Sequence, residues 1–349
     1  MPNITITALA DNVNSTRFEW DTERAKTDMQ AKPVPLLDNL RKLSKKPHDG
    51  GHLVIEPHDF YNHSVPSRFD GAGFNLIDYT FNTVGYPARW EWADFCQPIG
   101  YSGHEKRQNA GAAMMIDIIK QRQMNVQRHH DRLIQRSFLI QDTAALTDVL
   151  PINGQDYSDG AIEAAAVGAQ VNTYLNISKS VFASRPGWQN QYATASGSFS
   201  TEGVTKARAM MNAGERLGNA QNTKAPPNLH LYVSTAFYDN YDRETLLQKR
   251  WVNSGGAVDL VGGPQELFGK TPIHQINDDM PTTGPWSALL LDHSCWDYHV
   301  NQGLDGTMGD WQPMAAARQD AMVALLHTMI QLSCGYLGTS GILINADTY

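Results

Sequence analysis

Cysteine is scarce in this chain of 349 residues, which has three, at positions 96, 295 and 334. Thiols so few and so widely spaced exclude a disulfide framework and a cysteine-based zinc site, and an odd number is typical of a reducing compartment. No basic segment followed by an apolar one opens the sequence, so we expect no signal peptide. The longest apolar run, near 286–291, is far shorter than the ~20 residues that cross a bilayer. We therefore expect a soluble, cytoplasmic product without a membrane partner.

Catalytic signatures are missing as well. The sequence has no Gly-x-Ser-x-Gly elbow, and Cys96 has no base beside it that would activate its thiol. The adjacent carboxylates Asp278 and Asp279 stand close to Pro281, without a second acid nearby, which is typical of a solvated turn and not of a glycosidase site. The sequence therefore predicts no active site and no cofactor, and we expect the protein not to be an enzyme.

The nearest approach to a nucleotide motif is the stretch PQELFGKT at 264–271. A phosphate-binding loop needs glycine at its first position and a helix after its last. Here the first residue is Pro264, Pro272 follows directly, and the residues beyond it have the pattern of a strand. A surface loop is the favoured interpretation. A soluble nucleotide-using hydrolase with its site in 255–281 stays as an alternative of a different class.

Potential metal ligands are dense between positions 48 and 63. They are His48, Asp49, His52, Glu56, His58, Asp59 and His63. Their spacing matches none of the tight pairs that close zinc sites, and Pro57 and Pro66 keep the segment extended. A polar ribbon exposed to solvent has the same composition, so no metal site is predicted. On a helix, the consecutive His129 and His130 would point about 100° apart and could not chelate one ion.

Charge is distributed unevenly, although the net value of -8 is modest. Residues 225–349 hold 13 acidic and 5 basic side chains, so the first 224 residues are neutral overall. We expect an acidic surface on the last third, and basic patches on the long helix and at Arg41, Lys42, Lys45 and Lys46. A partner with negative charge is one interpretation of these patches, and a solvated surface is the commoner one.

The first 88 residues have little capacity to fold alone. Residues 1–50 are polar, are interrupted by prolines and contain one short amphipathic piece, at 36–43, that needs a neighbour to be ordered. Residues 51–88 alternate β-favouring and turn residues around Asp70-Gly71, which predicts a long hairpin. A two-stranded ribbon is marginal in water, so it too should lie on another surface.

The most informative stretch joins an aromatic strand to a long helix. Trp90, Trp92 and Phe95 line one edge of an extended segment that we expect to turn at 98–100. Apolar residues at three- and four-residue steps then predict an amphipathic helix from 104 to about 136. About thirty residues at 1.5 Å each span about 45 Å, which suits a structural strut better than the wall of an active site.

The rest of the chain alternates between helices and strands, as in an α+β protein. The expected elements are a helix at 201–217 ended by Gly218-Asn219, a strand at 229–234, a helix at 236–249 capped by Thr235, and strands at 271–276 and 287–300. The segment 322–332 fits the helix and the strand templates equally well.

In their order, these pieces resemble the major capsid proteins of tailed bacteriophages. At 90–111 an aromatic strand and a Gln-Pro-hydrophobic turn lead through GHEKRQNAG into the long helix, which corresponds to the family's spine helix. The tryptophan-bearing loop at 180–190 and the strand, turn and helix at 228–250 follow in the family's order. So do the strand before an acidic turn at 269–279 and the strand at 289–300. The resemblance runs from about residue 50 to the end.

The resemblance implies the α+β fold named after phage Hong Kong 97, with a strand at 322–332. Its parts in this chain would be an amino-terminal arm at 1–50, an extended β-hairpin loop at 51–88, a peripheral domain with the spine helix at 89–150 and 296–335, and an axial domain at 151–295 and 336–349. Many relatives begin with a cleaved scaffolding segment where this chain has a short arm. Either a separate scaffold helps, or the sequence is a mature form.

The implied function is that of a major capsid, or major head, protein. Such a structural protein assembles into the icosahedral shell that encloses the double-stranded DNA genome of a tailed phage. Its partners would be itself in many copies, as hexamers and pentamers, the packaged DNA through non-specific contact, and portal, scaffold and decoration proteins. It would assemble in the host cytoplasm and reside in the virion. An encapsulin-like cellular shell that holds cargo enzymes is the closer alternative.

Six residues are predicted at subunit contacts or on the inner surface, because they flank the junction between the ribbon and the long helix. They are Arg89, Trp90, Trp92, Lys106, Arg107 and Arg122. No catalytic, cofactor-binding or metal-binding residue is assigned.

Overall fold

The computed structural model describes the larger part of the chain. The described residues are 34–60, 83–108, 112–139, 173–174, 177–178, 186–188, 190–195, 198–221, 227–252, 271–276, 286–314, 319–344 and 346. Three features of the sequence lie outside these residues: the Asp70-Gly71 turn, most of the stretch 264–271, and the Asp278-Asp279 pair.

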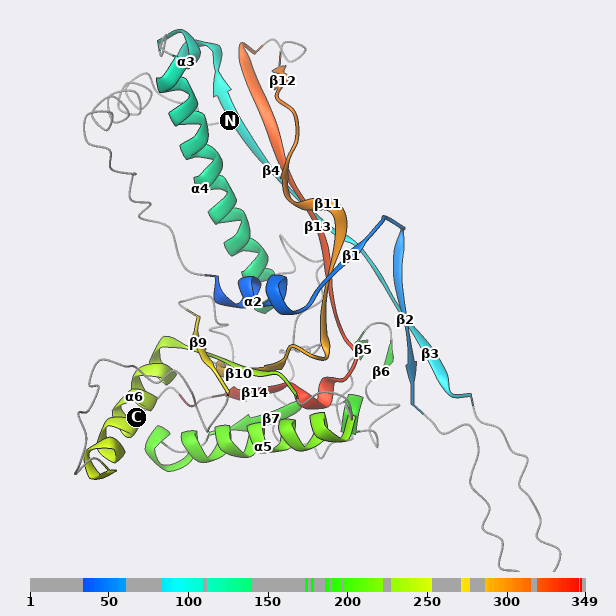
Figure 1. The fold of residues 1–349 in the computed structure, drawn as a ribbon, viewed down its shortest axis with the longest axis vertical. Helices are drawn as coiled ribbons and strands as arrows, with labels where there is room; N and C mark the ends of the chain where they lie inside the picture. The colour runs from blue at the N-terminus through cyan, green and yellow to red at the C-terminus, as the bar shows by residue number, and fades with distance from the viewer. Residues whose placement is uncertain are drawn as a thin grey trace, which may run out of the picture.

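The elements form an upper body around a long helix, a lower body around a second sheet, and a ribbon that projects sideways (Figure 1). The helices are α2 (Pro35–Leu43), α3 (Gly103–Gln108), α4 (Ala112–Leu139), α5 (Val204–Gln221) and α6 (Thr235–Val252), with short helical turns η2 (Pro186–Trp188), η3 (Phe199–Gly203) and η5 (Leu337–Thr339). None of the described helices has the length and apolar character that a bilayer crossing requires.

The strands are more numerous than the sequence indicates. They are β1 (Lys45–His48), β2 (Leu53–Asp59), β3 (Gly85–Glu91), β4 (Ala93–Ser102), β5 (Thr173–Tyr174), β6 (Ile177–Ser178), β7 (Gln191–Thr194), β8 (Leu229–Val233), β9 (Ile273–Gln275), β10 (Trp286–Asp292), β11 (Trp296–Met308), β12 (Gln312–Pro313), β13 (Ala321–Cys334) and β14 (Gly341–Ile344). The α+β class is therefore confirmed.

The upper sheet is built on β13. Its order is β1-β11-β13-β12, with β4 on the other side of β13, and both β11 and β4 run antiparallel to it. The segment that fits both templates is thus a strand, as the resemblance implied. Helix α4, 28 residues long, lies along this sheet, where His130 and Thr328 form a hydrogen bond of 2.8 Å. The long strut predicted from periodicity is confirmed.

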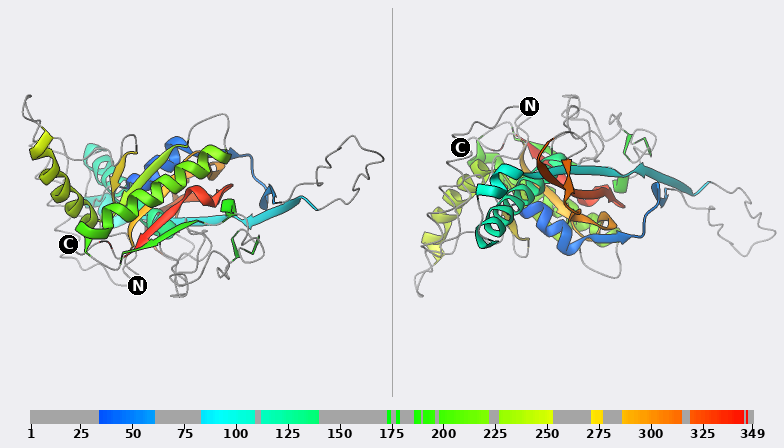
Figure 2. Two further views of the ribbon diagram at one scale, coloured as in Figure 1. Left: turned by 90° about the horizontal axis from the view of Figure 1, so that it is seen from below. Right: turned by 90° about the horizontal axis from the view of Figure 1, so that it is seen from above.

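The lower sheet is mixed. Its order is β7-β14-β10-β8-β9, with β14 parallel to β7, β8 parallel to β9, and the remaining pairs antiparallel. Helix α5 packs against β14 and β10 (Figure 2). Phe199 and Phe237 meet edge to face beneath the helices, with ring centroids 5.0 Å apart. A second apolar core thus lies between α5, α6 and one face of this sheet.

The expected turn at 98–100 is wrong. Pro98, Ile99 and Gly100 lie inside β4 and pair with Leu325, Ala324 and Val323 of β13. Among the described strands β4 pairs with β13 alone, so half of its N–H groups face away from the ladder, and a proline is tolerated on such an edge strand. The chain turns instead at 102–103, where α3 begins.

Two helix ends also differ from the prediction. Helix α5 continues past Gly218 to Gln221. That glycine allows a close approach and does not end the helix, because a Cβ there would lie 2.7 Å from Cβ of Pro227. Helix α6 is capped by Ser234, whose hydroxyl accepts a 3.1 Å hydrogen bond from the N–H of Phe237, and not by Thr235.

The single strand expected at 287–300 is two strands, β10 and β11, which belong to different sheets. The chain reverses at 293–295, where the buried Asp292 carboxylate accepts hydrogen bonds from the N–H and the hydroxyl of Ser294. Apolar residues continue across this turn, so periodicity did not indicate it.

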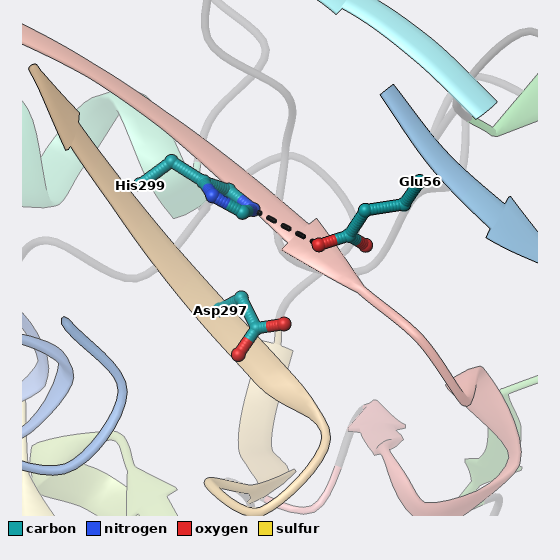
Figure 3. Close-up of side chains that lie close together, drawn as sticks. All are labelled: Glu56, Asp297 and His299. Atoms are coloured by element: carbon teal, nitrogen blue, oxygen red, sulfur yellow. Dashed lines mark ion pairs between the residues drawn. The ribbon is translucent and has the colours of Figure 1, made fainter. Parts of the chain in front are cut away.

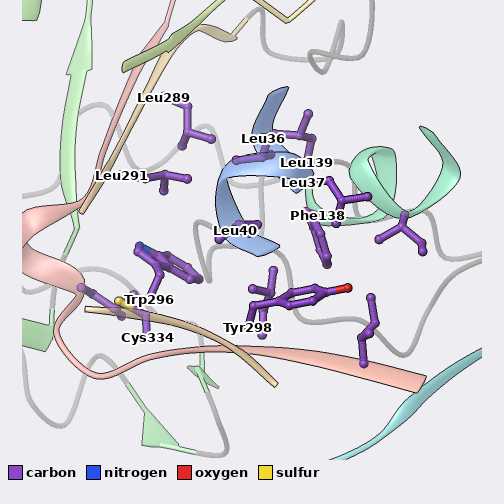
Figure 4. Close-up of a cluster of buried hydrophobic side chains, with 14 of the residues drawn as sticks. Leu36, Leu37, Leu40, Phe138, Leu139, Leu289, Leu291, Trp296, Tyr298 and Cys334 are labelled. Carbon is purple, nitrogen blue, oxygen red and sulfur yellow. The ribbon is translucent and has the colours of Figure 1, made fainter. Parts of the chain in front are cut away.

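The short amphipathic piece of the arm is α2, and its neighbour is the body of its own chain. Leu36, Leu37 and Leu40 have no solvent exposure. They pack in the core cluster that also contains Phe138 of α4 and Tyr298 of β11 (Figure 4). The neighbour that 36–43 needs is therefore its own chain, and β1 is likewise covered because it pairs with β11.

Candidate assembly surface

The ribbon of β2 and β3 has one face that is exposed along its described length. The strands are antiparallel, in a register that runs from Leu53 opposite Glu91 to Asp59 opposite Gly85. They form a two-stranded sheet that extends away from the body in every view (Figures 1 and 2). Ile55 is 55% exposed, an unusual degree for its type. The predicted hairpin strands are confirmed, and the face of the ribbon that carries Ile55 offers surface to another molecule.

One face of the ribbon is covered by its own chain, because Val54 and Ala88 are buried in the main apolar cluster. Phe60 and His58 both contact the ring of Trp188 in η2, with centroids 5.1 Å apart in each pair. Tyr86 of β3 packs edge to face on Phe60 at 5.8 Å. Apolar ring pairs of this kind stabilise a contact beyond the area that they bury. The aromatic cluster therefore sets the direction in which the ribbon leaves the body.

The predicted contact residues of the ribbon have different environments. Trp92 is half-buried, donates its indole N–H to the carbonyl of Gly51 at 2.9 Å, and meets the ring of His48 edge-on. It thus joins β1, β2 and β4 within one chain. Arg89 is exposed on β3, and the side chain of Trp90 lies outside the described part of the structure.

The basic residues of the junction divide in the same way. Arg122 donates from Nη1 to Glu105 and to the carbonyl of Gly100, each at 3.0 Å. Burial opposes ionisation of Glu105, but the hydrogen bonds from Arg122 and Ser102 outweigh it, so the pKa of Glu105 is lowered. Arg122 is therefore a structural residue that fixes α4 against the start of α3.

Ser102 and Glu105 form a second feature of this junction, which the reading of the sequence missed. The N–H of Glu105 donates to the Ser102 hydroxyl at 3.2 Å, and the N–H of Ser102 donates to the Glu105 carboxylate at 3.0 Å. This reciprocal pair is a capping box, and its Ser-x-x-Glu spacing is visible at 102–105. It marks the start of α3 at Gly103, one residue before the helix start expected at 104.

Lys106 and Arg107 lie exposed on α3, at the far end of the upper body. Arg107 forms an ion pair of 2.7 Å with Asp320, and both side chains are about two-thirds exposed, so the pair adds little stability. Lys106 lines a hollow of about 400 Å³ together with Tyr101 and Met322. These two cations are accessible to a partner.

Solved structures of shell proteins match nearly the whole chain, whereas no protein-family model and no curated protein matches the sequence. The capsid of cyanophage A-1(L) has 14% sequence identity, a TM-score of 0.60, and coverage of 94% of this chain and 96% of its own. The capsid of a native GTA particle has 12% identity, a TM-score of 0.56, and coverage of 93% and 96%. The SrpI encapsulin of Synechococcus elongatus PCC 7942 has 11% identity, a TM-score of 0.51, and coverage of 95% of both chains.

The chain has the capsid fold. At these identities the likeness is one of architecture, and it covers more than nine-tenths of the chain. The Hong Kong 97-like fold implied by the order of the sequence pieces is confirmed.

In this capsid fold most of the basic residues at 41–46 are neutralised by the chain itself. Arg41 forms ion pairs with Asp131 at 2.9 Å and with Asp305 at 3.0 Å. Lys45 pairs with Asp305 and Lys46 with Asp297. Arg41, Lys45 and Lys46 are thus paired with carboxylates of α4 and β11, whereas Lys42 is exposed, so the interpretation of the patch as a site for a negatively charged partner stays a prediction.

A histidine network, which the sequence did not indicate, joins α2 to the lower sheet of the capsid fold. His293 faces the Tyr232 hydroxyl at 2.8 Å and the Ser44 hydroxyl at 3.2 Å. Burial lowers the pKa of His293 to about 3, with smaller effects from the neighbouring rings of His230 and His274. All three pKa values are lowered, so these rings are neutral at pH 7.

Proposed function

We propose that this chain is the major capsid protein of a tailed phage, which assembles into the icosahedral shell around its double-stranded DNA. The observation that carries the proposal is the likeness to phage capsid chains over more than nine-tenths of both partners. The exposed ribbon supports it, since a shell subunit needs a projection that its neighbours cover.

The domain boundaries follow from the same proposal. The arm would occupy 1–50, the extended loop 51–88, the peripheral domain 89–150 and 296–335, and the axial domain 151–295 and 336–349. The upper sheet with α4 suits the peripheral domain, and the lower sheet with α5 and α6 suits the axial domain. Because α2 and β1 pack into the body, a working arm would be limited to the residues that precede them.

The partners proposed are copies of this chain, arranged as hexamers and pentamers, and packaged DNA held by non-specific contact. Portal, scaffold and decoration proteins are further partners of the same kind of particle. The protein would assemble in the host cytoplasm and remain in the virion. It would act as a structural protein without catalysis.

Electron microscopy of the purified full chain tests the proposal most directly. Closed shells of uniform diameter are expected, because many weak contacts add up in a closed symmetric assembly. If the chain remains monomeric at all concentrations, also after portal, scaffold and decoration proteins of the same particle are added, the proposal is contradicted.

An encapsulin-like shell is a second candidate, and the match to the SrpI encapsulin favours it specifically. The two functions differ in what the shell encloses. Nucleic acid extracted from native particles would support the phage capsid, whereas a folded enzyme as the main internal component would support the cellular shell. A nucleotide-using hydrolase predicts thermal stabilisation by ATP with Mg²⁺, and an unchanged melting temperature would exclude it.

The accessible junction residues are proposed as subunit contacts or inner-surface residues. The exposed ones are Arg89, Lys106 and Arg107, and the same role is proposed for Trp90, Trp92 and Arg122. We expect Lys106→Ala to reduce the yield of shells while the subunit stays folded, and Arg122→Ala to destabilise the subunit itself because it holds Glu105. If Trp92→Ala assembles normally from a folded subunit, Trp92 is not a contact residue.

A further inference from the structure

Three potential metal ligands meet where the ribbon leaves the upper sheet (Figure 3). Glu56 comes from β2, and Asp297 and His299 come from β11. One ligand atom of each lies within 4.8 Å of the others. Asp297 and His299 are two positions apart on one strand, whereas Glu56 is distant in the sequence and is brought to them by the fold.

The position and hydrogen bonding of His299 suit a metal ligand. Its ring is 1% exposed, and its Nδ1 lies 2.7 Å from Nε2 of His48. With the Nδ1 proton donated to His48, the lone pair on Nε2 faces the cluster. A second group that holds the other ring nitrogen is the usual support of a metal-binding histidine.

The negative charges of Glu56 and Asp297 are not fully balanced by nearby cations. The side chains of Glu56 and Asp297 are only about one-fifth exposed, so water screens the repulsion between their carboxylates incompletely. Lys46 contacts Asp297 and is the cation that faces the cluster, but its side chain is 53% exposed. A long, solvated ammonium group can leave Asp297 at low cost. The two carboxylates then present two negative charges, which match one divalent cation.

The spacing of the ligand atoms fits one small ion. Nε2 of His299 and Oε1 of Glu56 are 3.5 Å apart, close to the ~3.4 Å expected for two ligands at about 2.1 Å from one tetrahedral ion. The Ser333 hydroxyl lies 2.7 Å from Nε2 of His299 and 3.3 Å from Oε2 of Glu56, so a neutral oxygen faces the same space.

We propose that Glu56, Asp297 and His299 form a binding site for a first-row divalent metal ion, with Zn²⁺ the best match. One imidazole with two carboxylates suits zinc, whereas Ca²⁺ and Mg²⁺ require more oxygen ligands than the cluster offers. Because Glu56 lies on the ribbon and the other two on the body, the ion ties the base of the ribbon to the upper sheet. The site does not depend on what the ribbon contacts.

Calorimetric titration of the EDTA-treated full chain with ZnCl₂ tests the site, with CaCl₂ as the comparison. One Zn²⁺ per chain is expected, with at least tenfold weaker binding of Ca²⁺. Glu56→Gln and Asp297→Asn should each weaken Zn²⁺ binding at least tenfold. Glu91→Gln, an exposed carboxylate on the partner strand of the ribbon, should leave it unchanged. Zinc binding that is absent, or equal in Glu56→Gln and the native chain, would overturn the proposal.

Hydrogen exchange gives a second reading that does not depend on assembly. Zinc should slow amide exchange in 53–59 of the unassembled native chain and not in Glu56→Gln, whose fold circular dichroism can verify. Unchanged exchange in 53–59 of the zinc-loaded native chain would refute the tie between ribbon and body. Shell formation by the EDTA-treated chain is scored separately, so the metal site and the capsid function can fail independently.

Discussion

Helix α2 and the β2–β3 ribbon lie close together in the sequence and have opposite fates in the structure. In the sequence, each segment is too small to fold alone and needs another surface to cover its apolar residues. The leucines of α2 are completely buried by the chain's own body, whereas Ile55 on the ribbon remains more than half exposed. A segment that needs a neighbour therefore does not by itself indicate a second subunit, because the body of the same chain can be that neighbour.

The largest difference between the two regions should come from removing a buried leucine of α2. Leu37→Ala leaves a cavity beside Phe138 and should lower the free energy of unfolding by about 3 kcal/mol. Leu43→Ala, on the same helix but 46% exposed, should change it by less than about 0.5 kcal/mol. Urea unfolding of the unassembled chain measures both, and equal effects would mean that α2 does not pack as described.

The ion pairs give the next largest effect. Arg41→Met removes the partner of Asp131 and Asp305 in a largely buried site and should cost about 2 kcal/mol. Arg107→Met breaks an exposed pair and should cost less than about 0.5 kcal/mol. The same urea titrations distinguish them, and a cost for Arg107 as large as that for Arg41 would contradict the difference in burial.

Acid should loosen the contact between α2 and the lower sheet. His293 has a lowered pKa of about 3, so below its ordinary pKa the unfolded chain takes up a proton that the folded chain refuses. Stability is therefore complete above about pH 6.5 and falls as the pH decreases, by about 1 kcal/mol from this residue at pH 5.5. Comparison of melting temperatures at pH 7.5 and 5.5 should show a smaller decrease in His293→Gln.

The ribbon should show the smallest effect on the subunit and the largest on the shell. Ile55→Asp places a charge on an exposed position, so the free energy of unfolding should change by less than about 0.5 kcal/mol. If neighbouring subunits cover the ribbon, the same change should abolish or strongly reduce shells seen by electron microscopy. Normal shells would show that this face of the ribbon stays in solvent.

Periodicity was sufficient for the long helix and for most strands. It could not decide the segment of β13, where the burial pattern is set by partners on both sides. Residues that usually end elements were the main source of error. Pro98 lies in the edge strand β4, which tolerates a proline. Gly218 lies inside helix α5 and allows the close approach of Pro227 from outside the helix. Such roles depend on which segment lies opposite, and local sequence does not contain that information.

The candidate contact surface was only partly predictable. The sequence located the ribbon and the junction, but it could not separate Arg122, which is paired with Glu105, from the exposed Lys106. The cluster of Glu56, Asp297 and His299 was invisible for a related reason. Asp297 and His299 are two positions apart, but Glu56 is more than 200 positions away, so no spacing rule connects all three.

The burial of α2 has a consequence for synthesis. Its partners include residues near 293 and 330, and the hydrogen-bonded pair Ser44 and His293 is separated by 249 positions. A ribosome must release most of the polypeptide before these leucines can be covered, and closing so distant a contact is slow. Nascent chains should thus expose the apolar face of α2 during much of translation, and we expect a chaperone to bind this segment.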